Sequence, residues 1–274
     1  MTGRGGGDAP LIAVDGLTKR YASGRGALTV FEGLRFAIGE GEFLTIVGPS
    51  GCGKSTLLKM VAGLVRSTDG TVVFRGRTVT APRPEMIYVF QQYEKSVFPW
   101  LTVRENVAFG LQRRQEPGSA AKAERVEQLI HRVELHGYED YYPNQLSGGM
   151  QQRVALARAL ACHPSVLLMD EPFSAVDALT RANLQQLVLE LWQELKLTVL
   201  FVTHDVDEAV FLSTRVMALA GAPARVDLDV PIDLAYPRDQ VASREHREFI
   251  ARRRELFLSI TRQPARDAVA EAAG

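Results

Sequence analysis

The sequence predicts an α/β protein built on a largely parallel sheet that a helical insertion interrupts. Two observations support this fold class. Apolar strand-like runs alternate with segments of helical periodicity after residue 43, which is typical of parallel sheets. A Gly-rich loop also joins the β-branched run at residues 43–47 directly to an apolar helical segment that continues from Leu57.

The N-terminal part predicts short strands and turns. We expect strands over residues 11–14 and 34–38, with a turn at Asp15 and Gly16 between them. A second turn at residues 39–41 precedes the strand at 43–47. Further strands are predicted at residues 72–74 and 86–90, and residues 1–10 are expected to form a flexible tail.

The period becomes helical between about residues 100 and 162. One helix is predicted by an apolar stripe of Val126, Leu129, Ile130 and Val133, ended by Gly137. A second helix covers residues 148–161 and stops before Pro164. The chain then predicts a buried strand over residues 166–169, an amphipathic helix and a strand over residues 198–202. That amphipathic helix carries Leu184, Leu187, Val188, Leu191, Trp192 and Leu195.

Near the C-terminus we expect one more amphipathic helix. The pattern that predicts it consists of Phe249, Ile250, Arg253, Leu256, Phe257 and Ile260. Packing against the rest of the protein is favoured, and a helix lying on a membrane surface is the alternative.

Composition limits the classes of function. The chain has 274 residues and is 46% hydrophobic, as a packed globular protein requires. Its 32 basic and 32 acidic residues cancel, so we expect no nucleic-acid partner. No run approaches 18 apolar residues, and the first eight residues lack the apolar segment of a signal peptide, which predicts a cytosolic chain.

The Gly-rich loop matches the full phosphate-binding pattern GxxxxGK[ST] between a predicted strand and a predicted helix. It consists of Gly48, Pro49, Ser50, Gly51, Cys52, Gly53, Lys54, Ser55 and Thr56. Free N–H groups at the start of the helix suit a polyphosphate. Lys54 can reach the β- and γ-phosphates, and the Ser55 hydroxyl is placed to bind Mg²⁺.

Two carboxylates, Asp170 and Glu171, follow the apolar run at residues 166–169. At the end of a parallel strand they would lie beside the phosphate loop. We expect Asp170 to hold Mg²⁺, directly or through water, and Glu171 to act as the general base for an attacking water. A second helix start, with Ser147 as N-cap before Gly148 and Gly149, is another anion-binding geometry.

Taken in order, these motifs closely resemble those of ATP-binding cassette (ABC) ATPases over roughly residues 11–222. The resemblance implies a P-loop NTPase fold with a RecA-like parallel core, an antiparallel β subdomain and a helical subdomain. It also implies ATP and Mg²⁺ as cofactors. It assigns Gln91 to sensing Mg²⁺ and water, His204 to the γ-phosphate, Asp177 to communication across a dimer, and Tyr21 to stacking on adenine.

The resemblance further implies that two cassettes pack head to tail, in a homodimer or a heterodimer, with each ATP between the phosphate loop of one chain and residues 147–149 of the other. On this basis residues 11–224 form the ABC ATPase domain, with a helical subdomain at about 95–162. Residues 225–274 form a short C-terminal extension.

A single phosphate loop and the absence of a predicted membrane span resemble the ATPase subunit of a transporter. Such a subunit needs an integral membrane permease and, indirectly, an extracytoplasmic solute-binding protein, and lies peripherally on the cytoplasmic face of the inner membrane. Phe98 and Trp100 look like the permease groove of nitrate, sulfonate and taurine importers, although both could instead be core. The alternative function is a soluble ABC ATPase that acts as an ATP-gated assembly module.

Overall fold

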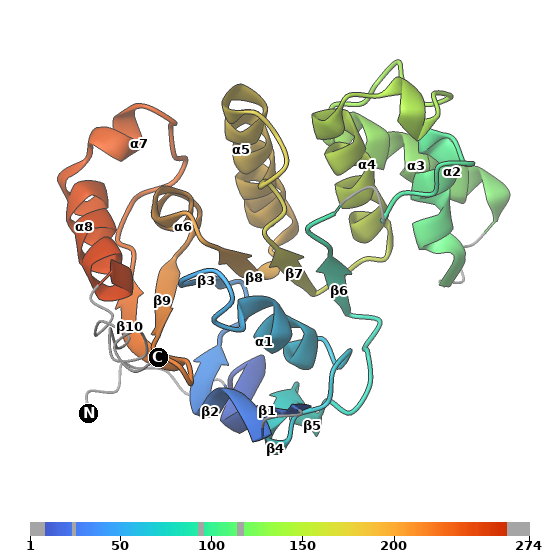
Figure 1. Ribbon diagram of the computed structural model, residues 1–274. Helices are drawn as coiled ribbons and strands as arrows, with labels where there is room; N and C mark the ends of the chain where they lie inside the picture. The colour runs from blue at the N-terminus through green and yellow to red at the C-terminus, as the bar shows by residue number, and fades with distance from the viewer. Residues whose placement is uncertain (1–8, 24–25, 93–95, 114–117, 262–274) are drawn as a thin grey trace, which may run out of the picture.

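The computed structural model describes residues 9–23, 26–92, 96–113 and 118–261, arranged as two sheets and their covering helices (Figure 1). The side chains of residues 23, 26 and 113 are not described. Most of the expected N-terminal tail, residues 1–8, therefore lies outside the described residues.

The smaller sheet is antiparallel, in the order β2-β1-β4-β5. Its strands are β1 (Ile12–Ser23), β2 (Gly26–Ile38), β4 (Asp69–Phe74) and β5 (Arg77–Thr78). The predicted turn at Asp15 and Gly16 is wrong, because β1 continues through both residues. A shift in pairing register between Val14 and Leu17, with Gly16 at φ 62°, marks a bulge that bends the strand without ending it.

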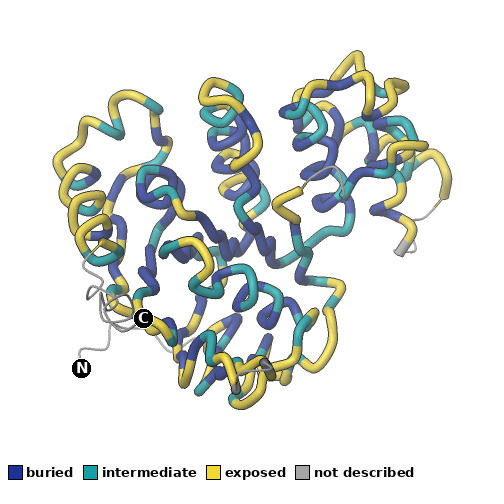
Figure 2. The backbone as a smooth tube through the Cα atoms, viewed as in Figure 1, coloured by how far each residue is buried: buried dark blue, intermediate teal, exposed yellow. Residues whose placement is uncertain are grey.

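The larger sheet has the order β10-β9-β3-β8-β7-β6. Its parallel core comprises β6 (Met86–Val89), β7 (Val166–Asp170), β8 (Thr198–Thr203), β3 (Phe43–Val47) and β9 (Arg215–Ala220). The edge strand β10 (Arg225–Pro231) runs antiparallel to β9. Every residue of β3, β7 and β8 is buried, which explains their continuous apolar runs (Figure 2).

The parallel sheet separates two apolar cores. On one side, α1 (Lys54–Val61) and the antiparallel sheet cover alternate residues of the strands, including Leu44, Ile46 and Leu168. On the other side, α5 (Ala178–Leu195) and α6 (Val206–Leu212) cover Phe43, Val47 and Phe201. Because β3, β8 and β7 run parallel, their C-terminal ends lie at one edge of the sheet.

The helical part of the chain lies beside β6 (Figure 1). It contains α2 (Val103–Gly110), η2 (Leu111–Arg113), α3 (Ser119–Arg132), η3 (Pro143–Gln145) and α4 (Gly148–Ala161). The predicted bounds of α4 are confirmed. The stripe of α3 is also buried, but this helix ends at Arg132, before Gly137, and Glu134 then adopts a left-handed φ of 56°.

The last elements are α7 (Ala242–Glu245) and α8 (Arg247–Thr261). Phe249 and Leu256 of α8 are fully buried, and the helix contacts α6, β9 and β10. The expected packing of this helix is therefore confirmed. Its apolar face is narrower than predicted, because Ile250 and Phe257 are exposed.

Candidate functional site

The phosphate loop lies between β3 and α1. Gly53 precedes the helix at φ 100°, and a Cβ added there would lie 2.3 Å from Val30 Cγ1 of β2. Conformation and space thus both require glycine at this position. The Lys54 ammonium is buried and donates to the carbonyl oxygens of Gly48 at 2.8 Å and Pro49 at 3.0 Å. The backbone of the phosphate loop therefore binds the Lys54 ammonium on the inner side of the loop.

The other loop residues form the turn and the start of α1. Ser50 and Gly51 are exposed, and Thr56 is half-buried on the helix. Cys52 donates its N–H to the Pro49 carbonyl at 3.3 Å. Burial raises the pKa of the Cys52 thiol. The thiol therefore stays protonated at neutral pH, which agrees with a backbone role for this residue.

Asp170 ends β7 and is nearly inaccessible to solvent. Its Oδ1 accepts a hydrogen bond from Ser55 Oγ at 2.7 Å, and its Oδ2 accepts one from Tyr88 Oη at 2.6 Å. Burial, followed by the hydrogen bond to Asp170, raises the pKa of Tyr88, so its phenol remains a donor. A hydroxyl and a carboxylate oxygen thus meet beside the phosphate loop.

Glu171 follows in a left-handed conformation, φ 43°, and donates its N–H to the Val202 carbonyl of β8 at 2.9 Å. Its Oε2 lies 3.0 Å from His204 Nδ1 and 3.5 Å from Gln91 Nε2. Its Oε1 lies 4.0 Å from Lys54 Nζ. Gln91 after β6, His204 after β8 and Lys54 of the phosphate loop therefore converge on this one carboxylate.

The second predicted helix start belongs to α4. Ser147 is its exposed N-cap, and the Ser147 hydroxyl accepts a hydrogen bond from the Met150 N–H at 3.3 Å. A Cβ on Gly149 would lie 2.3 Å from Thr180 Cγ2, so glycine allows α4 to approach α5 closely. Asp177 caps α5, and hydrogen bonds from Thr180 lower the pKa of its carboxyl.

Tyr21 lies on β1 with an exposed ring, and Lys19 Nζ is 4.7 Å from the ring centroid. Its cross-strand partner is Leu28 of β2, two residues from the Val30 side chain that contacts Gly53. Strand β2 thus pairs with Tyr21 at Leu28 and reaches the phosphate loop at Val30.

Apart from the phosphate-loop residues 48–53 and Thr56, the predicted site residues fall into two groups. The first is a contact cluster of Lys54, Ser55, Gln91, Asp170, Glu171 and His204. The second comprises Tyr21, Ser147, Gly148, Gly149 and Asp177, for which the described part of the chain records no hydrogen bond or ion pair to the cluster.

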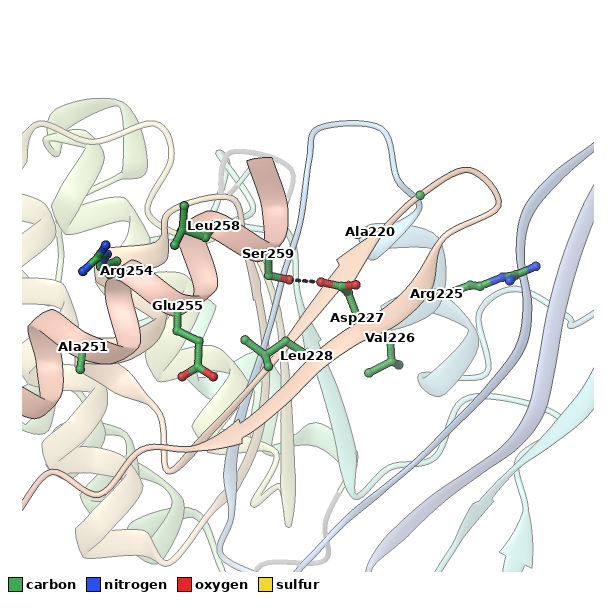
Figure 3. A pocket seen from close by; sticks show the side chains of 11 residues that line it. Ala220, Arg225, Val226, Asp227, Leu228, Ala251, Arg254, Glu255, Leu258 and Ser259 are labelled. Atoms are coloured by element: carbon green, nitrogen blue, oxygen red, sulfur yellow. Dashed lines mark hydrogen bonds between the residues drawn. The ribbon is translucent and has the colours of Figure 1, made fainter. Parts of the chain in front are cut away.

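Sequence reasoning missed Tyr88, whose hydroxyl belongs to the cluster. The sequence contains a tyrosine three residues before Gln91, but only the parallel pairing of β6 with β7 places it next to Asp170. A wide cavity of about 1020 Å³ between the β9–β10 hairpin and α8 contains no predicted site residue (Figure 3).

The donor set of the cluster fits a phosphate and a hard cation. The first turn of α1 contains no acidic residue, so its N–H groups and Lys54 present positive charge to an anion. The Ser55 hydroxyl and Asp170 Oδ1, already in contact, are oxygen ligands of the kind that Mg²⁺ prefers. No described helix is long and apolar enough to cross a membrane.

Known proteins have sequences similar to this one over most of its length. The ABC transporter family profile matches residues 31–174. The chain is 41% identical over 231 residues to the aliphatic sulfonates import ATP-binding protein SsuB of Bacillus thuringiensis subsp. konkukian, which covers 84% of this chain and 90% of the relative. It is 47% identical over 249 residues to an uncharacterized ABC transporter ATP-binding protein of Methanocaldococcus jannaschii, which covers 90% of both.

A solved structure has the same fold. A dimeric, post-hydrolysis ATP-binding cassette bound to ADP and Pi superposes with a TM-score of 0.71 at 32% identity, covering 81% of this chain and 98% of that one. The α/β fold predicted for an ABC cassette is therefore confirmed. The family match, and identities above 40% over most of the sequence, show that this chain belongs to the ABC transporter family as an ATP-binding cassette ATPase.

Proposed function

We propose that this chain is the nucleotide-binding subunit that powers an ABC importer for a small anion, with aliphatic sulfonates as the first candidate cargo. The observation that carries the proposal is the convergence of Lys54, Gln91 and His204 on Glu171, beside the Ser55–Asp170 pair. The sulfonate importer name of the 41% identical relatives supports the cargo class. Nitrate and taurine are the other candidates.

In this proposal the loop from Gly48 to Thr56 and the α1 N-terminus bind the ATP phosphates. Lys54 exchanges its carbonyl partners for phosphate oxygens, a charge-assisted contact. Ser55, Asp170 and Gln91 hold Mg²⁺, which when bound offsets phosphate charge during transfer. Tyr21 offers its exposed ring face for adenine stacking.

Glu171 is the group that handles the proton. Its Oε2 accepts a proton from water as the water oxygen attacks the γ-phosphorus and the bond to the β–γ bridging oxygen breaks, giving ADP and phosphate. His204 Nδ1, 3.0 Å from this oxygen, holds the carboxylate, and the His204 ring would contact the γ-phosphate when ATP is bound. The Gln91 amide orients the water.

A second cassette would complete the site. Ser147 caps the start of α4 and makes no hydrogen bond or ion pair to the cluster of its own described chain. The helix-start N–H groups other than that of Met150, which donates to Ser147 Oγ, are therefore proposed to bind a phosphate held by another copy. Asp177, at the start of the adjacent α5, would transmit closure across the interface. The dimeric solved relative supports this arrangement, in a homodimer or a heterodimer.

A permease would dock near Phe98 and Trp100. The view that both aromatics are core is wrong for Trp100, which is 69% exposed and stacks on Phe98 at 5.2 Å. Phe98 in turn packs against Phe109 and under the Arg158 guanidinium. A rigid, exposed aromatic on a packed base is a common interface anchor. The subunit would then lie peripherally on the cytoplasmic membrane face, with a solute-binding protein acting outside.

We also propose the domain division of residues 11–224 as the cassette, about 95–162 as its helical subdomain, and 225–274 as an extension, of which the part after 261 lies outside the described residues.

An ATP-gated assembly module without transport is the second candidate function. Glu171, which we propose as the base and which lies 4.0 Å from Lys54, supports hydrolysis over a purely structural use of ATP.

The test is co-purification of the membrane permease with this chain, followed by uptake of candidate anions into vesicles supplied with internal ATP. We expect uptake of an alkanesulfonate that stops when Glu171 is replaced by Gln. A complex that hydrolyses ATP but transports none of an alkanesulfonate, taurine and nitrate would contradict the cargo class. A chain that captures no permease would favour the assembly module.

A further inference from the structure

Tyr88 makes a direct contact with a proposed magnesium ligand. Its hydroxyl donates to Asp170 Oδ2 at 2.6 Å, while Ser55 Oγ donates to Oδ1 at 2.7 Å. The two oxygens of one buried carboxylate are thus held from opposite sides, by β6 and by α1.

The sheet register places this phenol. Tyr88 of β6 pairs with Leu168 of β7, so the two side chains occupy the same face of the sheet. Asp170 lies two residues beyond Leu168 and therefore on that same face, which α1 covers. Phe90 packs on the Tyr88 ring at a centroid distance of 4.6 Å and limits its movement. The hydroxyl is consequently aimed at Asp170 by rigid elements on either side.

The two donors have different roles in the proposed site. Ser55 is itself a proposed magnesium ligand: its hydroxyl oxygen would bind the ion through a lone pair while its O–H still donates to Asp170 Oδ1. Among the described residues, Tyr88 is the side chain that donates to the other carboxylate oxygen, Oδ2. A carboxylate without such a partner can rotate about its terminal torsion, which is broad. Hydrogen-bonded partners of metal ligands commonly contribute 10- to 100-fold to metal affinity.

We propose that Tyr88 is a positioning residue for Asp170: by occupying Oδ2, it directs Oδ1 toward the cation position beside Ser55. The proposal rests on the proposed function, because it takes Asp170 as the magnesium ligand. It assigns a role to a residue that belongs neither to the phosphate loop nor to the Asp170–Glu171 pair. In this proposal Tyr88 acts through the Asp170 carboxylate and not by binding the nucleotide or the ion itself.

The test is Tyr88→Phe, which deletes one oxygen and keeps the ring that packs on Phe90. Tyr236→Phe is the matched control, since Tyr236 is another partly buried tyrosine whose hydroxyl donates, at 3.0 Å, to the Leu212 carbonyl away from the cluster. For each purified full chain, ADP affinity is measured in EDTA. Binding of Mn²⁺ to the ADP-saturated chain is then followed by electron paramagnetic resonance, with thermal melting as the check on folding.

We expect Tyr88→Phe to bind ADP in EDTA within about twofold of the unchanged chain and to bind Mn²⁺ about tenfold more weakly. Tyr236→Phe should change neither value. Equal Mn²⁺ affinity in Tyr88→Phe and the unchanged chain would overturn the proposal, as would an equal loss in Tyr236→Phe. If the unchanged chain with ADP binds no Mn²⁺, the proposed magnesium site itself fails, a result distinct from failure of Tyr88 alone.

Discussion

Glu171→Gln tests the proposed base with the least change of shape. The amide keeps an oxygen that can accept hydrogen bonds from His204 Nδ1 and Gln91 Nε2, which lie 3.0 Å and 3.5 Å from Glu171 Oε2. It removes the negative charge 4.0 Å from Lys54 Nζ. At an effective dielectric constant of about 20, that attraction is about 4 kcal/mol before desolvation. Losing it frees Lys54 for phosphate, so ATP affinity should hold or increase.

Turnover should respond in the opposite direction. A positioned general base contributes about 10²- to 10⁴-fold, or roughly 3 to 5.5 kcal/mol of barrier. We therefore expect phosphate release to fall by that factor while ATP binding, measured by calorimetry, persists. Glu190→Gln is the control, because Glu190 is an exposed carboxylate on α5 that contacts only the nearby Gln186 in the described chain. Turnover of Glu171→Gln within about threefold of the unchanged protein would refute the role of Glu171 as base.

Four other changes have defined outcomes. Lys54→Ala should weaken ATP binding by about 10- to 100-fold in a direct titration, because a buried cation facing the phosphates is lost; unchanged affinity would contradict the site. Replacing both Phe98 and Trp100 by Ala should weaken permease capture while basal ATP turnover and melting temperature stay near normal; unfolding would mean that the pair is core. Arg238→Met should cost about 3 kcal/mol in urea unfolding, because the buried guanidinium donates to four backbone carbonyls; a loss below about 0.5 kcal/mol would contradict this. Burial raises the folded-state pKa of the Glu208 carboxyl above its ordinary value of 4.5. The contribution of the protonated carboxyl to the free energy of unfolding is therefore fully present below pH 4.5, and it is lost as the pH rises through the folded-state pKa. Glu208→Gln should remove this decline in a pH series of unfolding curves, and an unchanged pH profile would count against it.

The sequence predicts best where local chemistry alone determines structure. The bounds of α4 follow from a serine N-cap at one end and a proline three residues after the other. The phosphate loop is likewise local, because glycine at φ 100° and the following lysine are needed whatever surrounds them. The acidic pair is recognisable from its apolar strand, since a fully buried parallel strand has a continuous apolar run.

Long-range pairing explains what could not be predicted. The bulge at Gly16 lets β1 continue through a sequence typical of a turn, because the antiparallel neighbours β2 and β4 hold both sides of it. Tyr88 meets Asp170 only through strand register. Ile250 and Phe257 fit a helical stripe, yet β9, β10 and α6 cover only the narrower face centred on Phe249.

In the described part of the chain, Ser147 makes no hydrogen bond or ion pair to the Glu171 cluster. The central claim is therefore that two copies of the chain share each ATP site. The measurement that tests it most directly is the molar mass of the Glu171→Gln chain, by light scattering after gel filtration, with saturating ATP or ADP. We predict a dimer with ATP and a monomer with ADP, and a monomer with ATP once Ser147→Arg is added to block the exposed helix start. A chain that binds ATP yet remains monomeric, or whose ATP-dependent dimer survives Ser147→Arg, would contradict a site completed by residues 147–149 of a second copy.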